Sequence, residues 1–181
     1  GAMISIVTEM LDGTTVEVGV VGRYGMAGLS AFLAAPQASC HAFVQIEGES
    51  DRLALKDFRR LVTPGTQLYF RLLRYTESFL VQSAQSAACN ALHTLPQRCA
   101  RWLLMVADQI GRESFHLTQE FLAQMLGVRR AGVTAAEGTL RRNGLIESSR
   151  GMLFLRDRPG LEQAACECYA VIRAETGRIF G

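Results

Sequence analysis

Hydrophobic and polar positions change their period along the chain, and the changes divide it into three regions. Residues 3–10 and 14–21 are rich in Ile, Val and Thr, and Asp12-Gly13 stands between them. An Asp-Gly pair flanked by alternating apolar residues is a strong signal for a β-hairpin. The other elements predicted in this region are strands at residues 40–47 and 51–55, a short helix at 29–34 and a helix or one helical turn at 56–61. The first region is therefore expected to be a small β-domain.

A helical period follows and runs through residues 66–92. Apolar residues step by four and three along one face, which is the spacing of a coiled-coil seam. The residues predicted to form a dimer interface along this seam are Leu68, Leu72, Tyr75, Phe79 and Ser86. A second apolar stripe through Leu73 and Leu80 gives the helix more apolar surface than one partner covers. We favour a seam between two copies of the chain; the alternative is a helix packed on its own strands.

Residues 118–146 carry the pattern of two short helices joined by a tight turn. Thr118 is suited to cap the first helix, because its hydroxyl accepts a hydrogen bond from a backbone N–H that has no helical partner. Ala123, Gly127 and Val133 then provide a small residue where the helices cross, a glycine where the chain turns and an apolar residue between the helices. Size, turn and periodicity agree, so this stretch predicts a helix-turn-helix.

Elements on both sides of this stretch complete a winged helix-turn-helix. Thr94 and Gln97 have capping-box spacing at the start of a helix that covers residues 94–110. A loop is expected at residues 111–116. Two short strands around Arg150 predict a β-hairpin, the wing, and a last helix at 160–176 is expected to pack on this unit.

Composition and charge alter this picture only slightly. The chain has 181 residues, is 49% hydrophobic and has a net charge of +2, so it can bury a core and any basic surface must be local. Its basic residues are almost all arginine, whose planar fork suits phosphates and guanine edges, although a GC-rich genome would produce the same bias. No apolar run approaches the roughly 20 residues of a membrane helix. Gly1 and Ala2 before Met3 are typical of a tag remnant.

The five cysteines are Cys40, Cys89, Cys99, Cys166 and Cys168. They are scattered, odd in number and not preceded by a secretory segment, which indicates thiols in a reducing cytoplasm. The last two stand two positions apart, a poor metal-binding spacing compared with paired C-x-x-C motifs, and no histidine is near them in the sequence. Buried or idle thiols are therefore expected, with no metal and no cofactor.

Strands with a glycine-rich loop, a long helix and a winged helix-turn-helix follow one another in an order that resembles the Crp/Fnr family of bacterial transcription regulators. The resemblance covers nearly the whole chain and is most specific at residues 118–146. It implies an α+β fold with three parts: a partial, jelly-roll-like β-roll at residues 1–62, a dimerisation helix at 63–93, and a DNA-binding winged helix-turn-helix with an extra C-terminal helix at 94–181. It also implies a homodimer that binds palindromic double-stranded DNA, with RNA polymerase as a further partner.

The β-domain departs from the family pattern in ways that bear on its ligand. The family's roll usually has several strands before the one that begins at Met3. Its cyclic-nucleotide binders carry a Glu in the glycine loop and a later Arg for the phosphate, whereas residues 25–28 here read Gly-Met-Ala-Gly and residues 40–42 read Cys-His-Ala. A phosphate site without its cation loses a charge-assisted contact. Cyclic AMP is therefore not expected, and neither is haem or an iron–sulfur cluster. The candidate effector-binding residues are Gly22, Arg23, Gly25, Met26, Gly28 and His41.

The second helix of the helix-turn-helix is expected to place its N-terminal residues in the major groove. Arg130 matches the family's base-reading arginine and is the candidate for guanine O6 and N7. Ala131 and Ala135 stand where the family often has an acidic and a second basic reader, so base readout should be sparser. The predicted DNA-contacting residues are Thr118, Gln119, Arg129, Arg130, Thr134, Ala135 and Arg150.

The sequence thus predicts a cytoplasmic, homodimeric, sequence-specific transcription regulator in which a signal in the β-domain shifts the population of DNA-competent geometry. No Ser-His-acid order, no paired carboxylates and no Walker-type loop appear, which argues against an enzyme. One alternative is a small-molecule sensor or dimerisation module that has lost its DNA function. Another is a constitutive DNA binder with an empty effector domain.

Overall fold

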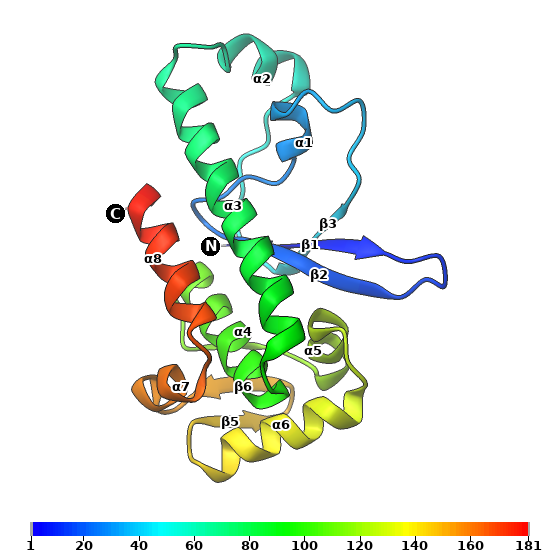
Figure 1. Ribbon diagram of the computed structural model, residues 1–181, viewed down its shortest axis with the longest axis vertical. Helices are drawn as coiled ribbons and strands as arrows, with labels where there is room; N and C mark the ends of the chain where they lie inside the picture. Colours follow the sequence, from blue (N-terminus) through cyan, green and yellow to red (C-terminus); the bar gives the residue numbers. More distant parts are fainter. Residues whose placement is uncertain (1, 181) are drawn as a thin grey trace.

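A computed structural model describes residues 2–180 and arranges them around one long helix, α3 (Gln67–Leu92) (Figure 1). A three-stranded sheet lies beside the middle of α3, and two short helices lie near its N-terminal end. The remaining helices and a second small sheet gather towards its C-terminal end (Figure 1). The predicted α+β class, with small antiparallel sheets, is confirmed.

The N-terminal sheet is built from β1 (Met3–Glu9), β2 (Thr15–Val21) and β3 (His41–Ile46), in the order β2-β1-β3 with antiparallel neighbours. The turn between β1 and β2 forms at the predicted Asp-Gly pair. The Asp12 carboxylate accepts a hydrogen bond from the Thr14 N–H at 2.9 Å, and Gly13 has a φ of 81°, which favours glycine. Alternate residues of β1 point into the core, as the pleat of a half-buried strand requires.

The prediction of a strand at residues 51–55 is wrong. Residues 51–54 form no regular element, and α2 (Leu55–Leu61) begins where the strand was expected to end. The Ala54 carbonyl accepts hydrogen bonds from the N–H groups of Asp57 and Phe58, which starts a helical turn. Asp57 in the first turn and two arginines in the last suit the helix dipole. Local helix-forming interactions therefore override the apolar alternation of this segment. The predicted short helix before β3 forms as α1 (Leu29–Phe32).

The long helix begins as predicted, with Thr66 as its N-cap and the Thr66 hydroxyl accepting a hydrogen bond from the Tyr69 N–H at 3.2 Å. Its middle packs on β2. The Gln82 side-chain carbonyl accepts a hydrogen bond from the Val20 N–H at 2.7 Å, and the Ser83 hydroxyl donates to the Val18 carbonyl at 3.1 Å. Gly19 permits this approach, because a Cβ there would stand 2.6 Å from the Phe79 ring.

The C-terminal unit is organised around α4 (Leu95–Ile110), of which Leu103, Leu104 and Val106 are fully buried. Its other elements, in chain order, are β4 (Ser114–His116), α5 (Gln119–Leu126), α6 (Arg130–Arg142), β5 (Ile146–Ser149), β6 (Met152–Leu155), α7 (Arg158–Ala164) and α8 (Cys168–Phe180). The second sheet has the order β4-β6-β5. The strand β4 lies where a loop was predicted, because three residues are enough to pair with the wing strand β6.

The last predicted helix, at residues 160–176, is two helices. The chain leaves helical geometry at Ala165, whose ψ is 162°, and α8 restarts at Cys168. Apolar periodicity continues across the break, so the sequence pattern did not reveal it. The break lets α7 pack on α4 and lets α8 turn back along α3 (Figure 1). None of the helices within residues 2–180 is long and apolar enough to span a membrane.

Candidate DNA-binding surface and a cysteine–histidine cluster

The helix-turn-helix predicted at residues 118–146 is formed by α5, α6 and the turn between them. Thr118 caps α5, its hydroxyl accepting a hydrogen bond from the Phe121 N–H at 3.2 Å. Gly127 ends α5 with a φ of 62°, a conformation that costs a residue with a Cβ roughly 1–2 kcal/mol. Val133 is fully buried between the helices, and Ala123 is nearly so. The local signals in the sequence therefore correspond to the interactions that fix the two helices.

A hydrogen-bonded link between α5 and α6 fixes the angle at which α6 is presented. The Gln119 side-chain amide donates to the Glu137 carboxylate at 2.7 Å, and the Thr134 hydroxyl donates to the Gln119 carbonyl oxygen at 2.9 Å. Glu137 is only 3% exposed, so its carboxyl group is held away from solvent and is hydrogen-bonded to Gln119. Sequence reasoning named Gln119 and Thr134 as DNA contacts and missed Glu137, whose acidic side chain gives no sign of burial in the sequence.

The N-terminal part of α6 presents one exposed surface. Its residues are Arg129, Arg130, Ala131, Thr134 and Ala135, and all five are exposed. Arg129 is the N-cap of α6, so its side chain lies at the start of the helix beside Arg130. These two guanidinium groups, carried by adjacent residues, make a local basic surface on a chain whose net charge is only +2. We call these five residues the α6 surface.

The wing contributes one more cation. β5 and β6 pair in an antiparallel hairpin whose two-residue turn is Arg150-Gly151. Both residues have positive φ, 49° and 79°, as a primed hairpin turn requires. Arginine is a costly choice there, because only residues such as Gly, Asn and Asp adopt this conformation easily. The turn holds the exposed Arg150 at the tip of the wing.

The candidate effector residues do not form one pocket. Gly22 and Gly25 are packed against the chain's own helices, because the side chain of Gln109 and the hydroxyl of Tyr75 occupy the places where their Cβ atoms would stand. The Met26 carbonyl accepts a hydrogen bond from the Tyr75 hydroxyl at 3.2 Å. The cavity beside this loop measures about 20 Å³, room for about one water molecule.

The remaining effector candidates are dispersed. The Arg23 guanidinium lies over the Tyr24 ring, 4.8 Å from its centroid, and Gly28 is the N-cap of α1 with a φ of 99°. His41 begins β3 opposite Val7 of β1, whereas the glycine loop leaves β2 next to Ile4 of β1. The central strand therefore separates His41 from the loop, and His41 instead lies 3.7 Å from the Glu9 carboxylate.

The predicted dimer seam on α3 faces the chain itself over much of its length. Leu72 and Tyr75 are buried in the single chain, and Phe79 packs beside Gly19 of β2. Ser86 accepts a hydrogen bond from the buried Arg101 at 3.3 Å. This packing matches the alternative interpretation of the stripe, a helix on its own strands. Leu68 alone of the five predicted residues is an exposed apolar side chain, at 42%.

A second stripe of α3 remains exposed along the helix. Its large apolar members Phe70, Leu73 and Leu80 are 54%, 43% and 59% exposed. It continues through exposed alanines at the same steps of four and three, and Glu77 is the one charge within it. The members of this stripe, which we call the exposed α3 stripe, are Phe70, Leu73, Glu77, Leu80, Ala84, Ala87 and Ala91.

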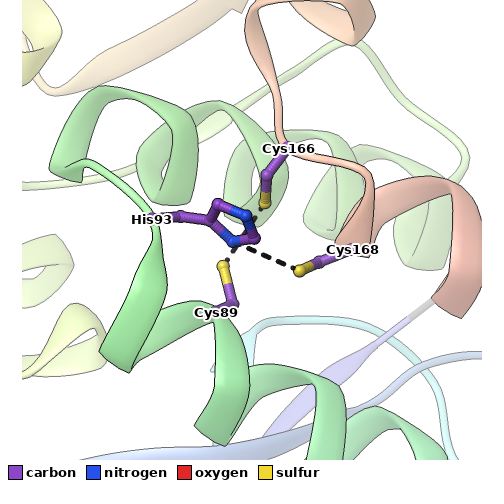
Figure 2. A group of neighbouring side chains, drawn as sticks. All are labelled: Cys89, His93, Cys166 and Cys168. Atoms are coloured by element: carbon purple, nitrogen blue, oxygen red, sulfur yellow. Dashed lines mark hydrogen bonds between the residues drawn. The ribbon is translucent and has the colours of Figure 1, made fainter.

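Four side chains that looked unrelated in the sequence meet near the C-terminal end of α3. Cys89 and His93 come from α3 and its cap, Cys166 comes from the break between α7 and α8, and Cys168 is the first residue of α8 (Figure 2). Their donor atoms all lie within 4.8 Å of one another. The predicted burial of these thiols is confirmed, whereas their closeness to one another and to His93 was not predicted. The contacts that join them span 77 and 75 positions of sequence, a separation at which spacing rules carry no signal.

Comparison with known proteins identifies the C-terminal unit. Residues 97–164 match the family model of the Crp-like helix-turn-helix domain. No curated protein sequence matches the chain.

Solved structures extend the likeness to almost the whole chain. A CRP-family transcriptional regulator from Thermus thermophilus has a TM-score of 0.72 at 22% identity, over 90% of this chain and 83% of that chain. A second regulator from this organism, of the CRP/FNR family, has a TM-score of 0.68 at 21% identity, over 90% and 83%. FixK2 from Bradyrhizobium japonicum has a TM-score of 0.65 at 15% identity, over 91% and 83%. At these identities the likeness shows a shared fold, that of Crp/Fnr regulators.

Proposed function

Because residues 97–164 form a Crp-like helix-turn-helix domain on a chain with the fold of Crp/Fnr regulators, we propose that this protein is a sequence-specific DNA-binding transcription regulator that acts as a homodimer. The observation that carries the proposal is the α6 surface. A recognition helix reads bases with residues near its N-terminus, and here that part of α6 is exposed and holds two adjacent arginines. Such a role belongs in the bacterial cytoplasm, where the DNA is.

The contacts divide into base readout and phosphate contacts. Arg130 is exposed and positioned one residue into α6, which suits bidentate hydrogen bonds to guanine O6 and N7. Ala131 and Ala135 offer methyl groups for thymine. Thr118 at the cap of α5 and Arg129 at the cap of α6 suit phosphates, and Arg150 at the wing tip reaches the neighbouring backbone. Gln119 acts by holding Thr134 and α6 in position, in addition to any phosphate contact.

The exposed α3 stripe is the proposed dimer seam, in place of the stripe predicted from the sequence. Its steps of four and three over seven positions fit a coiled coil, and its alanines allow close approach of two helices. Large exposed apolar residues in a row mark an interaction surface. Two chains joined here would present two α6 surfaces to half-sites about 34–36 Å apart on DNA.

Control by the β-domain is proposed to act through packing on the helix-turn-helix. The Gln124 side chain of α5 donates a hydrogen bond to the Thr15 hydroxyl of β2, and a Cβ on Gly127 would stand 3.1 Å from a Val16 methyl group. A change in the sheet would therefore move α5 directly. The chain's own side chains fill the space beside the loop at residues 22–28. This packing argues for a ligand that opens the loop, or for control without a small ligand.

Selection from a random-sequence DNA pool tests the proposal, with Arg130→Ala and Arg142→Ala run in parallel. Arg142 is the matched control: it is also an exposed arginine of α6, but it lies in the last turn. The wild type should enrich a palindrome. Arg130→Ala should lose the preference at one base pair per half-site, worth about 1–3 kcal/mol. Arg142→Ala should keep the motif. Binding that enriches nothing and falls steeply with salt would leave only non-specific phosphate attraction and would contradict the proposal.

A further inference from the structure

We propose that Cys89, His93, Cys166 and Cys168 bind one zinc(II) ion per chain at the junction of α3, α4 and α8 (Figure 2). Three thiols and one imidazole are a common donor set of structural zinc sites. The set is complete with four protein donors, so it leaves no open coordination position for a substrate or an activated water. The ion would therefore hold the fold together and would not catalyse a reaction.

The spacing of the donors fits a single ion. The Cys89 and Cys166 sulfurs are 3.4 Å apart, and the Cys168 sulfur is 3.5 Å from His93 Nδ1. Thiolates at about 2.3 Å from zinc stand about 3.8 Å from one another in a tetrahedron. The donors need only small shifts to reach that arrangement. An iron–sulfur cluster places several irons and sulfides between its ligands, so it would require a wider set than one within 4.8 Å.

The histidine is oriented for coordination through Nδ1. Its Nε2 lies 3.3 Å from the Glu167 carboxylate, and its Nδ1 faces the sulfurs. An Nε2–H that donates to Glu167 leaves the lone pair on Nδ1, directed at the proposed ion. A carboxylate behind the metal-binding histidine is the usual outer partner at zinc sites, where it fixes the tautomer and the ring orientation.

Backbone hydrogen bonds hold the donors at the end of α3 and at the start of α8. Cys89 and His93 are four residues apart at the end of α3, where the His93 N–H donates to the Cys89 carbonyl at 3.0 Å. Cys166 lies in the break before α8 and Cys168 begins α8, and the Tyr169 N–H donates to the Cys166 carbonyl at 3.1 Å. Thiols two positions apart converge because the chain is not helical between them. A further side chain of α3, Gln85, donates a hydrogen bond to the Cys168 sulfur at 3.2 Å.

Burial protects the site while leaving an entry. The three thiols are at most 5% exposed, whereas the side chain of His93 is 18% exposed. Zinc would enter beside the imidazole, and each thiol would lose its proton to solvent as its Zn–S bond forms. No electron transfer is involved.

The position of the site gives the ion a structural consequence. His93 and Thr94 are the two residues between α3 and α4, so the direction of α4 relative to α3 is set there. The ion would tie this joint to the start of α8. Because α4 is the centre of the helix-turn-helix unit, zinc would fix the orientation of that unit relative to the long helix.

Cobalt titration of the 181-residue chain tests the proposal without DNA. The protein is reduced, stripped of metal and titrated anaerobically with Co²⁺, which reports tetrahedral thiolate coordination by visible d–d bands and sulfur-to-cobalt charge-transfer bands. The expected result is one Co²⁺ per chain, displaced by one Zn²⁺. Cys40→Ser is the matched control, because Cys40 lies on the β-domain near Thr8 and outside the cluster.

Variants within the site separate coordination from folding. Cys168→Ser and His93→Ala should lose the tetrahedral spectrum, with circular dichroism checking that they fold. His93→Cys should restore it with added thiolate bands. Glu167→Gln, at a 74% exposed side chain, should bind Co²⁺ about 10–100-fold more weakly without loss of the fold.

The proposal would be overturned by the lack of a tetrahedral cobalt spectrum in the reduced protein, by an iron–sulfur chromophore in the protein isolated anaerobically, or by an unchanged spectrum in Cys168→Ser. A Cys89–Cys166 disulfide that persists under reductant would overturn it as well. The readout contains no DNA, so its outcome is independent of the proposed function.

Discussion

Glu17 is a carboxylic acid placed where the β-domain meets the helix-turn-helix unit. Its carboxyl accepts hydrogen bonds from the Trp102 indole N–H of α4 and the Ser5 hydroxyl of β1, both at 2.7 Å. Burial raises the pKa of Glu17 to about 7, although these hydrogen bonds and the charge of Arg101 act to lower it. Ser5 lies within bonding distance of Gln45 as well, and its single proton cannot serve both acceptors. A protonated Glu17 that donates to Ser5 would satisfy all three groups.

This raised pKa predicts that stability falls as the pH rises through neutrality. The folded state holds a proton on Glu17 more tightly than the unfolded chain does, so the contribution is complete below the ordinary pKa of 4.5 and is lost as the pH passes about 7. Urea unfolding at pH 5 and pH 8 measures the change in the free energy of unfolding. The Glu17→Gln variant keeps the hydrogen bonds without a charge. Relative to this variant, the wild type should lose about 1–3 kcal/mol of unfolding free energy between pH 5 and pH 8. Parallel pH profiles for the two proteins would show that Glu17 is ionised throughout.

At the scale of elements, α3 has two apolar faces with different roles. The face that includes Tyr75 and Phe79 covers the chain's own sheet, and the exposed α3 stripe is the proposed seam with a second copy. Replacing Leu73 and Leu80 by Glu places charges in the proposed seam and should give monomers by sedimentation at micromolar concentration. Leu53→Glu is the control: Leu53 is 50% exposed but lies outside α3. A double variant that stays dimeric would exclude this stripe as the seam.

Elements whose signals are local could be predicted from the sequence. The Asp12-Gly13 turn, the Thr118 cap and Gly127 fix their neighbours through interactions within a few residues, and each formed as expected. Which face of α3 packs on the sheet could not be predicted in this way, because both of its apolar stripes have helical spacing. Which one faces β2 depends on Gly19, a long-range fit to Phe79.

The break before α8 was missed for a similar reason. Apolar spacing runs through residues 160–176, and only packing on α3 and α4 shows that the chain must bend at Ala165. The cysteine–histidine cluster depends on that bend, so it was missed too. Spacing in the sequence can reveal metal ligands that lie on one element, whereas these four residues come from two distant segments of the chain.

In the whole molecule, the N-terminal sheet contacts the helix-turn-helix unit at two places. The sheet contacts α4 through Glu17 and Trp102 and contacts α5 through Thr15 and Gln124. Both contacts reach the unit that carries the α6 surface. A change in the β-domain or at the α3–α4 joint would therefore alter the presentation of α6, and a dimer would convert that change into a different separation of two recognition helices.

The most direct test of the central claim is a cycle of four binding measurements at one salt concentration. Wild type and Arg130→Ala are each measured on the selected duplex and on a duplex in which the guanine assigned to Arg130 is replaced in both half-sites. The wild type should lose about 1–3 kcal/mol per half-site on the altered duplex, and Arg130→Ala should bind both duplexes nearly equally. Equal losses for the two proteins would mean that Arg130 does not read that base, and would contradict sequence-specific recognition by the α6 surface.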